Sequence, residues 1–217
     1  KYQIKNNTNL FVSFNSENSE NSTKNISNNI STYENYFLGF GYEYKILKND
    51  MFKNDIFFIN INPSFGKRKT TNNTSKQIKI TVTLAYLLDL NRNNSIYFRN
   101  RTALLNSTNY FNNELFRIGG NKSIRGFNEQ SIFVKNYSIQ NIEFRYQTSK
   151  SSYMYTITDL ALISTTNSKE KLYSLGLGYL FNSNNSQINI STAVGTNTKS
   201  PLDFRNTQFF VNWVNFF

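Results

Sequence analysis

Apolar and small polar residues alternate with a period of two along most of this chain, and this pattern is typical of a β-strand with two unlike faces. Residues 171–182, KLYSLGLGYLFN, are the clearest case, because large apolar side chains alternate there with Ser and Gly. The same alternation recurs in segments of about ten residues, which is the length of a tilted membrane strand. We therefore predict about ten strands, at residues 2–15, 35–47, 55–66, 77–89, 95–106, 133–147, 153–165, 171–182, 186–197 and 207–217.

The composition of the two faces separates a soluble β-sandwich from a membrane barrel. A sandwich packs its apolar face into a core and carries charged residues on the other face. Here the polar face is rich in Gly, Ser, Thr and Asn, and aromatic residues lie near the ends of the apolar face. A transmembrane barrel has this pattern, with lipid outside, a polar lumen inside and aromatic girdles at both interfaces. The sequence therefore predicts an all-β, antiparallel transmembrane β-barrel, with lipid-facing side chains that include Tyr42, Leu84, Phe144, Leu177 and Trp213.

Composition excludes several classes of function. The 217 residues include no cysteine and no histidine, so disulfides, thiol chemistry, Cys/His zinc sites and the commonest general base are excluded. We predict no catalytic residues, no metal and no cofactor. The net charge of +11 does not indicate nucleic-acid binding, because the basic residues are scattered and form no stripe. Attraction to outer-membrane lipid and lipopolysaccharide explains that charge at least as well.

Short and long connections alternate between the predicted strands, as periplasmic turns and extracellular loops do in outer-membrane barrels. The last predicted strand finishes on phenylalanine, so we place the C-terminus on the periplasmic side. Counting back from it puts residues 106–132 in an extracellular loop. This loop contains GGNKSIRGF at residues 119–127, which has the residues of tight turns and the pattern of neither a strand nor a helix.

That segment, followed by about five predicted strands and a terminal Phe, resembles the outer-membrane insertase and translocator superfamily that includes BamA, TamA and FhaC. In this superfamily a sixteen-stranded barrel carries an Arg-Gly-Phe or Arg-Gly-Tyr motif at the tip of its sixth extracellular loop, and the loop folds into the lumen. The resemblance implies that residues 106–132 form this inward-folded loop. It assigns the motif and its preceding glycine pair to Arg125, Gly126, Phe127, Gly119 and Gly120.

The resemblance also implies partners for the arginine of the motif. The superfamily has an acid in the pattern Phe-x-Asp-x-Gly on the second strand after the loop, and ITDLA supplies Asp159 without the flanking Phe and Gly. A Glu followed two residues later by an Arg is common on the first strand, and IEFRY supplies Glu143 and Arg145. Because Phe144 between them belongs to the lipid face, alternation places Glu143 and Arg145 in the lumen.

The last predicted strand, TQFFVNWVNFF, carries an apolar stripe made of Phe209, Val211, Trp213 and Phe217. We expect this stripe to be the signal by which host machinery assembles the barrel. The resemblance covers residues 35–217, and the first six strands and the POTRA domains of the superfamily are not among the 217 residues. We therefore interpret residues 1–217 as one partial barrel domain, either the C-terminal portion of a sixteen-stranded barrel or a reduced relative.

The resemblance implies an outer-membrane protein that is not an enzyme and that inserts or translocates client outer-membrane or secreted proteins. A seam at the last strand would offer unpaired backbone groups to a client strand, while Arg125 and Asp159 hold the loop in the lumen. Upstream POTRA domains and accessory assembly subunits are expected partners. Two alternatives stay open, namely the barrel part of a patatin-like phospholipase with its Gly-x-Ser-x-Gly elbow before residue 1, and a passive or structural pore.

Overall fold

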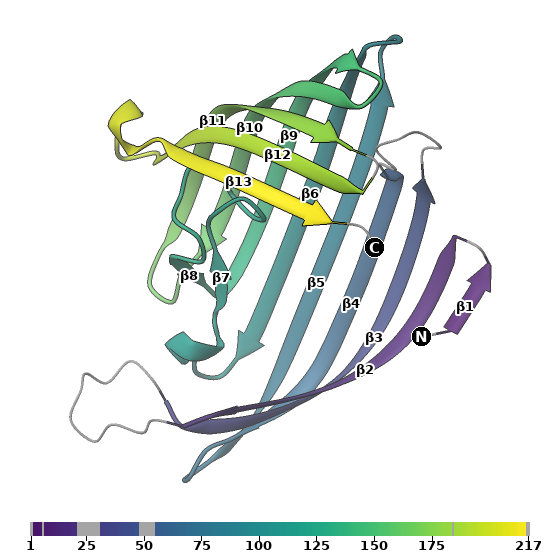
Figure 1. Ribbon diagram of the computed structural model, residues 1–217. Helices are drawn as coiled ribbons and strands as arrows, with labels where there is room; N and C mark the ends of the chain where they lie inside the picture. Colours follow the sequence, from purple (N-terminus) through teal and green to yellow (C-terminus); the bar gives the residue numbers. More distant parts are fainter. Residues whose placement is uncertain (1, 6, 21–30, 48–54, 184, 216–217) are drawn as a thin grey trace.

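The structure is a computed structural model that describes residues 2–5, 7–20, 31–47, 55–183 and 185–215. It contains one antiparallel sheet of eleven strands and a separate two-stranded hairpin. The strands of the sheet are β1 (Tyr2–Lys5), β2 (Thr8–Ser19), β3 (Tyr33–Leu47), β4 (Asp55–Lys69), β5 (Thr74–Asp89), β6 (Asn94–Ser107), β9 (Asn136–Ser149), β10 (Ser152–Ser164), β11 (Lys169–Asn182), β12 (Ser186–Asn197) and β13 (Gln208–Asn215). The hairpin consists of β7 (Phe116–Ile118) and β8 (Ile132–Val134). The sheet is strongly curved, and among the described residues β1 and β13 form its two open edges (Figure 1).

The all-β antiparallel class predicted from the alternation is confirmed, and most strands lie close to the predicted ranges. The main difference is at the N-terminus, where the predicted strand 2–15 consists of β1 and β2, so that the sheet has eleven strands. There the chain folds back and pairs Tyr2 with Leu10. The connection contains Asn7, and asparagine favours turns because its side chain bonds nearby backbone. The alternation does not reveal this turn, because no glycine or proline interrupts the pattern.

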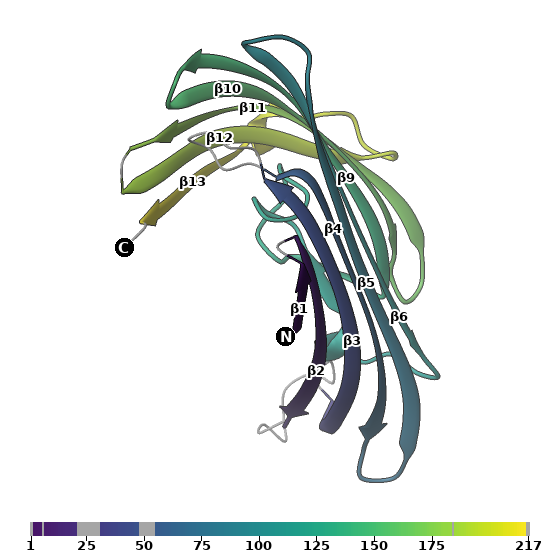
Figure 2. The same ribbon diagram turned by 90° about the vertical axis from the view of Figure 1, so that its right-hand side faces the viewer.

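The two faces of the sheet differ as the alternation predicts. In β11 every second residue from Tyr173 to Phe181 is exposed, whereas Leu172 and Ser174 on the opposite face are buried. The side chains of the convex face are largely apolar, and the curvature that separates them from the concave face is visible in Figure 2. A continuous apolar surface of this kind is what a lipid-facing sheet requires. Of the residues expected to face lipid, Leu84 is half-buried, and the exposed ones are Tyr42, Phe144, Leu177 and Trp213.

One residue expected on the lipid face is buried. The alternation puts Val194 on the same face as Ile190, but only 4% of Val194 is exposed whereas Ile190 is exposed. The connection from β12 to β13 contains the 3₁₀-helix η2 (Phe204–Asn206), which contacts β12. We attribute the burial of Val194 to this connection, because Thr196, two residues further along β12, donates its Oγ1–H to the backbone oxygen of Ser200 in the connection at 2.8 Å.

The long connection between β6 and β9 lies on the concave side of the sheet (Figure 2). It contains the 3₁₀-helix η1 (Asn112–Glu114), the β7–β8 hairpin and, between the two hairpin strands, the irregular segment 119–131. The predicted loop 106–132 is the larger part of this connection. Within the described residues, no helix is long and apolar enough to cross a bilayer.

Candidate functional site

Arg125 lies on the concave side of the sheet and binds Asp159 at two points. Its Nε donates a hydrogen bond to Oδ2 of Asp159 at 2.9 Å, and its Nη2 donates to Oδ1 at 2.6 Å. The backbone N–H of Arg125 also donates to Oδ2, at 2.9 Å. The carboxylate, on β10, is 0% exposed and the arginine side chain is 4% exposed. The structure thus brings together the two residues that the resemblance paired, in the planar two-point geometry that makes Arg–carboxylate contacts strong.

Glu143 and Arg145, both on β9, extend this contact into a network. Oε1 of Glu143 accepts a hydrogen bond from Nη1 of Arg125 at 2.6 Å. Its Oε2 accepts from Nε and Nη2 of Arg145, at 2.9 and 2.7 Å. The guanidinium of Arg145 lies 4.1 Å from the ring centre of Tyr97 and 5.0 Å from that of Tyr153, within cation–π range. Cations and carboxylates therefore alternate through the network, so that each of these buried charges has an opposite charge beside it.

Arg125 remains charged in this position. Burial by itself would lower the pKa of its guanidinium, but the hydrogen bonds to Asp159 and the charge of Glu143 outweigh burial and raise that pKa above its ordinary value. The loop therefore carries a permanent cation to the sheet. If the loop withdrew, the buried carboxylate of Asp159 would lose the partner that compensates its charge.

Gly126 and Phe127 place the motif against β12. Gly126 has φ +80°, and a Cβ at this position would lie 2.5 Å from the backbone N of Gly195 and 2.6 Å from the carbonyl carbon of Val194. Any side chain here would thus be strained and would also collide with the strand backbone. The ring of Phe127 lies over Gly195 and occupies the space that a Cβ at this glycine would need. Small residues on both partners allow the loop to contact the wall of the sheet this closely.

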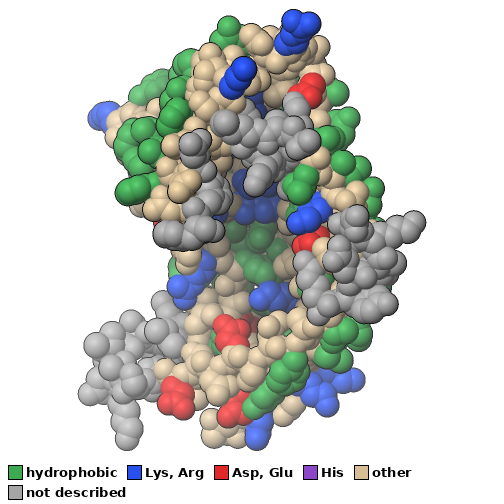
Figure 3. All heavy atoms as spheres, turned by 45° about the vertical axis from the view of Figure 1, so that its right-hand side comes forward, with side chains coloured by type: hydrophobic (Ala, Val, Ile, Leu, Met, Phe, Trp, Pro, Cys, Tyr) green, Lys and Arg blue, Asp and Glu red, His purple; other side chains and the backbone are tan. Residues whose placement is uncertain are grey.

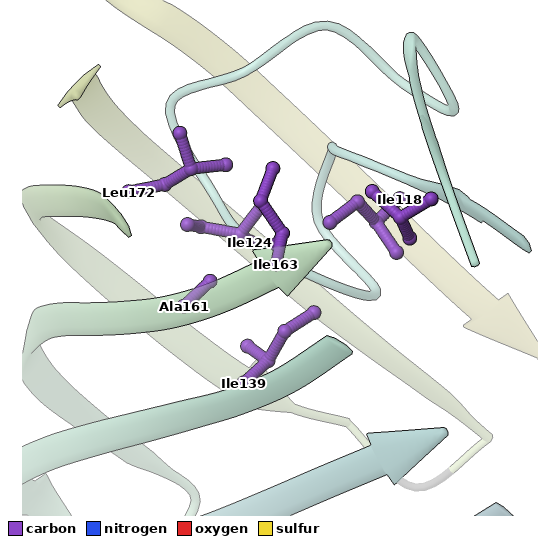
Figure 4. Packing of buried hydrophobic residues seen from close by; sticks show 7 residues of the cluster. Ile118, Ile124, Ile139, Ala161, Ile163 and Leu172 are labelled. Carbon is purple, nitrogen blue, oxygen red and sulfur yellow. The ribbon is translucent and has the colours of Figure 1, made fainter. Parts of the chain in front are cut away.

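An apolar cluster holds the loop beside these charges. Ile118 and Ile124 of the loop are buried, and they pack with Ile139, Ile163 and other residues that line the concave face (Figure 4). Burying one such side chain stabilises the contact by roughly 1.5–3 kcal/mol. The sequence analysis did not identify Ile124 as part of the site. The sequence could have indicated the burial of Ile124, because an apolar residue among the polar residues and glycines of GGNKSIRGF needs an apolar surface to cover it. The other members of the cluster are Val134, Ala161 and Leu172.

A second polar contact, which the sequence analysis also missed, holds the start of the loop. Oε1 of Glu114 accepts from Nη1 of Arg68 at 2.6 Å, and Oε2 accepts from Nε2 of Gln77 at 3.0 Å. Arg68 stacks over the ring of Phe111 at 4.1 Å and donates to the backbone oxygen of Asn109 at 3.0 Å. Glu114 lies far from its partners in sequence, so no local pattern pointed to this contact. The loop is thus held by charged contacts to β4, β9 and β10.

The remaining predicted residues lie in two other places. Gly119 and Gly120 have φ +114° and +87° and form the turn that brings the chain from β7 towards the motif. Phe209, Val211 and Trp213 on β13 point outwards and are exposed, as a stripe at an open edge strand. Phe217 lies outside the described residues. Among the described residues, no group of three or more Asp, Glu, His or Cys side chains is placed to hold a metal ion.

In a comparison with family models, residues 3–141 match the haemolysin secretion/activation proteins ShlB/FhaC/HecB. The matched segment spans more than half of the chain and includes the motif at Arg125. The chain belongs to this family. No curated protein matches the sequence. The predicted resemblance to the FhaC-containing superfamily is thereby confirmed, although Glu143 and Asp159 lie beyond the matched residues.

Membership of this family makes the protein an outer-membrane β-barrel protein of protein secretion. The all-β structure agrees with that location. Of the two activities that the resemblance implied, insertion and translocation, the family supports translocation of secreted client proteins across the outer membrane. The sheet of the described residues is open, so its concave face corresponds to part of a barrel lumen.

Proposed function

We propose that the protein translocates a secreted client along the concave face of its sheet, while the loop between β6 and β9 stays folded against that face. The observation that supports this most is the fully buried contact between Arg125 and Asp159. Several charge-assisted hydrogen bonds and an apolar cluster hold the loop in one position. A loop held in this way can narrow the lumen and still leave a path for the client. Translocation also needs no bond to be made or broken, which fits a chain without His or Cys.

We further propose that β13 forms one side of a seam and that the chain itself is not an enzyme. Among the described strands β13 pairs only with β12, and its other edge offers backbone N–H and C=O groups to a client strand. The outward stripe Phe209, Val211 and Trp213 would meet lipid and, together with Phe217, the host assembly machinery. Membrane lipid and lipopolysaccharide, upstream POTRA domains and accessory subunits are further proposed partners. The positive net charge and the apolar convex face support the lipid contacts.

The test is a comparison of the proteins released by cells that carry or lack the complete gene. A protein that disappears from the medium when the gene is deleted is the client. Complementation with Arg125→Ala should release less of that client at equal amounts of folded barrel. Arg205→Ala is the matched control, because it removes the same charge from an arginine whose side chain is 90% exposed.

Three outcomes would each reject part of the proposal. If the deletion strain releases an unchanged set of proteins, the protein has no secreted client, and a passive or structural pore is then the remaining function. Release of the client at the wild-type rate by Arg125→Ala, with the loop shown to be displaced, would mean that translocation does not depend on the loop contact. A lipase activity that resides in the barrel residues would overturn the assignment as a non-enzyme.

A further inference from the structure

A polar pocket of about 420 Å³ lies on the concave face, next to the loop. Five cationic side chains line it, and Glu143 is the acid among the lining residues. Figure 3 shows Lys and Arg side chains gathered in the hollow of the molecule. The network described above accounts for two of these cations, since Arg125 and Arg145 both bind Glu143. The cations that remain are Arg99, Arg101 and Lys122.

Arg99 and Arg101 have no acidic neighbour across the sheet. They are two residues apart on β6 and therefore point to the same, concave face. The residues paired with Arg99 are Ala85 and Asn141, and its Nε and Nη2 donate to the neutral Oδ1 of Asn141 at 3.2 and 3.1 Å. The residues paired with Arg101 are Thr83 and Ile139.

Arg101 is the less satisfied of the two. Its Nε and Nη2 are buried and have no hydrogen-bond partner among the described residues. Asp159 lies within electrostatic range of Arg101, but Arg125 already binds both of its carboxylate oxygens. Guanidinium N–H groups buried without an acceptor destabilise a fold, and a second guanidinium two residues away on the same face adds repulsion.

We propose that this pocket binds an oxoanion, with Arg99 and Arg101 on the wall of the sheet and Lys122 on the loop as its ligands. A sulfate, phosphate or carboxylate group would give the free N–H groups of Arg101 an acceptor and would offset the excess positive charge. Because Lys122 belongs to the loop and the arginines belong to β6, a bound anion would also tie the loop to the sheet. The inference concerns only this pocket and does not depend on the proposed translocation.

The test is equilibrium dialysis of radiolabelled inorganic sulfate against the folded full chain in detergent micelles. We expect saturable binding near one sulfate per chain that weakens as NaCl is raised, because salt screens the attraction. Arg101→Gln should weaken binding by about tenfold to a hundredfold, since it removes charge-assisted hydrogen bonds. The control Arg205→Gln removes an equal charge outside the pocket and should bind as the wild type does. Absence of saturable binding, or equal weakening in both variants, would overturn the proposal.

Two additions keep the test decisive. If Arg101→Gln does not fold, Lys122→Gln replaces it in the test, because the exposed side chain of Lys122 lies on the loop and is not part of the sheet. Unchanged sulfate binding by folded Lys122→Gln would exclude Lys122 as a ligand and would contradict the proposed site. A hexaglutamate peptide then distinguishes the source of the anion. Displacement of sulfate by this peptide assigns the site to carboxylates of a polypeptide, whereas sulfate binding that the peptide does not affect assigns it to small free oxoanions.

Discussion

Replacement of Arg125 by alanine should release the loop from the sheet. The variant leaves the carboxylate of Asp159 at 0% exposure, and among the described residues Arg125 is the only side chain that donates to it. Removing one partner of a buried ion pair typically costs about 3–5 kcal/mol, because the other charge stays uncompensated. Asp159→Ala should cost less than Arg125→Ala, because Arg125 then keeps its bond to Glu143 at 2.6 Å.

Hydrogen exchange of the backbone amides in residues 119–127 measures this opening directly. A cost of about 3–5 kcal/mol corresponds to exchange that is faster by roughly 10²–10⁴-fold. The double variant should cost less than the sum of the single variants, since both remove the same contact. Arg205→Ala is the control and should leave exchange in these residues unchanged. Unchanged exchange in Arg125→Ala, or strictly additive costs, would refute the reasoning that the pair holds the loop.

Four further predictions concern the same structure. Gly126→Ala should displace the loop, because a Cβ would lie 2.5 Å from the backbone N of Gly195 and φ is +80°. A short crosslinker should join cysteines placed at Ser123 and Asn141 when Gly126 is present and should fail to join them in Gly126→Ala. A cysteine at the outward Leu160, in place of the one at Asn141, is the control and should not crosslink to Ser123 in either protein. Leu177→Arg should lower the free energy of unfolding in lipid vesicles by about 2–4 kcal/mol, measured from the fluorescence of Trp213 in urea, and a value near zero would contradict the lipid-facing assignment. Deleting Phe217 should slow assembly of the barrel in cells more than it lowers the stability of assembled barrel, and equal assembly rates would remove the proposed signal. Because the pKa of Arg125 is raised, the stability that its charge contributes is present below its ordinary pKa and is lost only at still higher pH. The free energy of opening of residues 119–127, measured by hydrogen exchange, should therefore stay constant between about pH 7 and 10. A fall of this free energy in that pH range would mean that Arg125 is not the group that holds the loop.

Most strand positions could be predicted from the sequence, because a period of two in residue type records which side chains share a face of the sheet. The alternation in β11 predicted that Leu175 and Leu177 point outwards, and both are exposed. The turn between β1 and β2 was not predicted in this way, because no glycine or proline marks it in the sequence. The burial of Val194 could not be predicted either, because it depends on how a connection folds back over the end of its own strand.

The residues of the Arg125 site were available from a local motif, but their arrangement depends on the tertiary structure. The resemblance to the superfamily named the arginine and its acidic partners, and the alternation along β9 placed Glu143 on the inward face. The contacts of Glu114 with Arg68 and Gln77 and the packing of Ile124 join segments that are distant in the chain. The lack of a partner for Nε and Nη2 of Arg101 likewise depends on what distant segments place beside it. By itself the alternation in the sequence determined, for most strand residues, which of the two faces of the sheet they lie on. Only the tertiary structure decided which inward charges meet and which stay unpaired, because curvature and strand register, rather than residue type, set the distances between them.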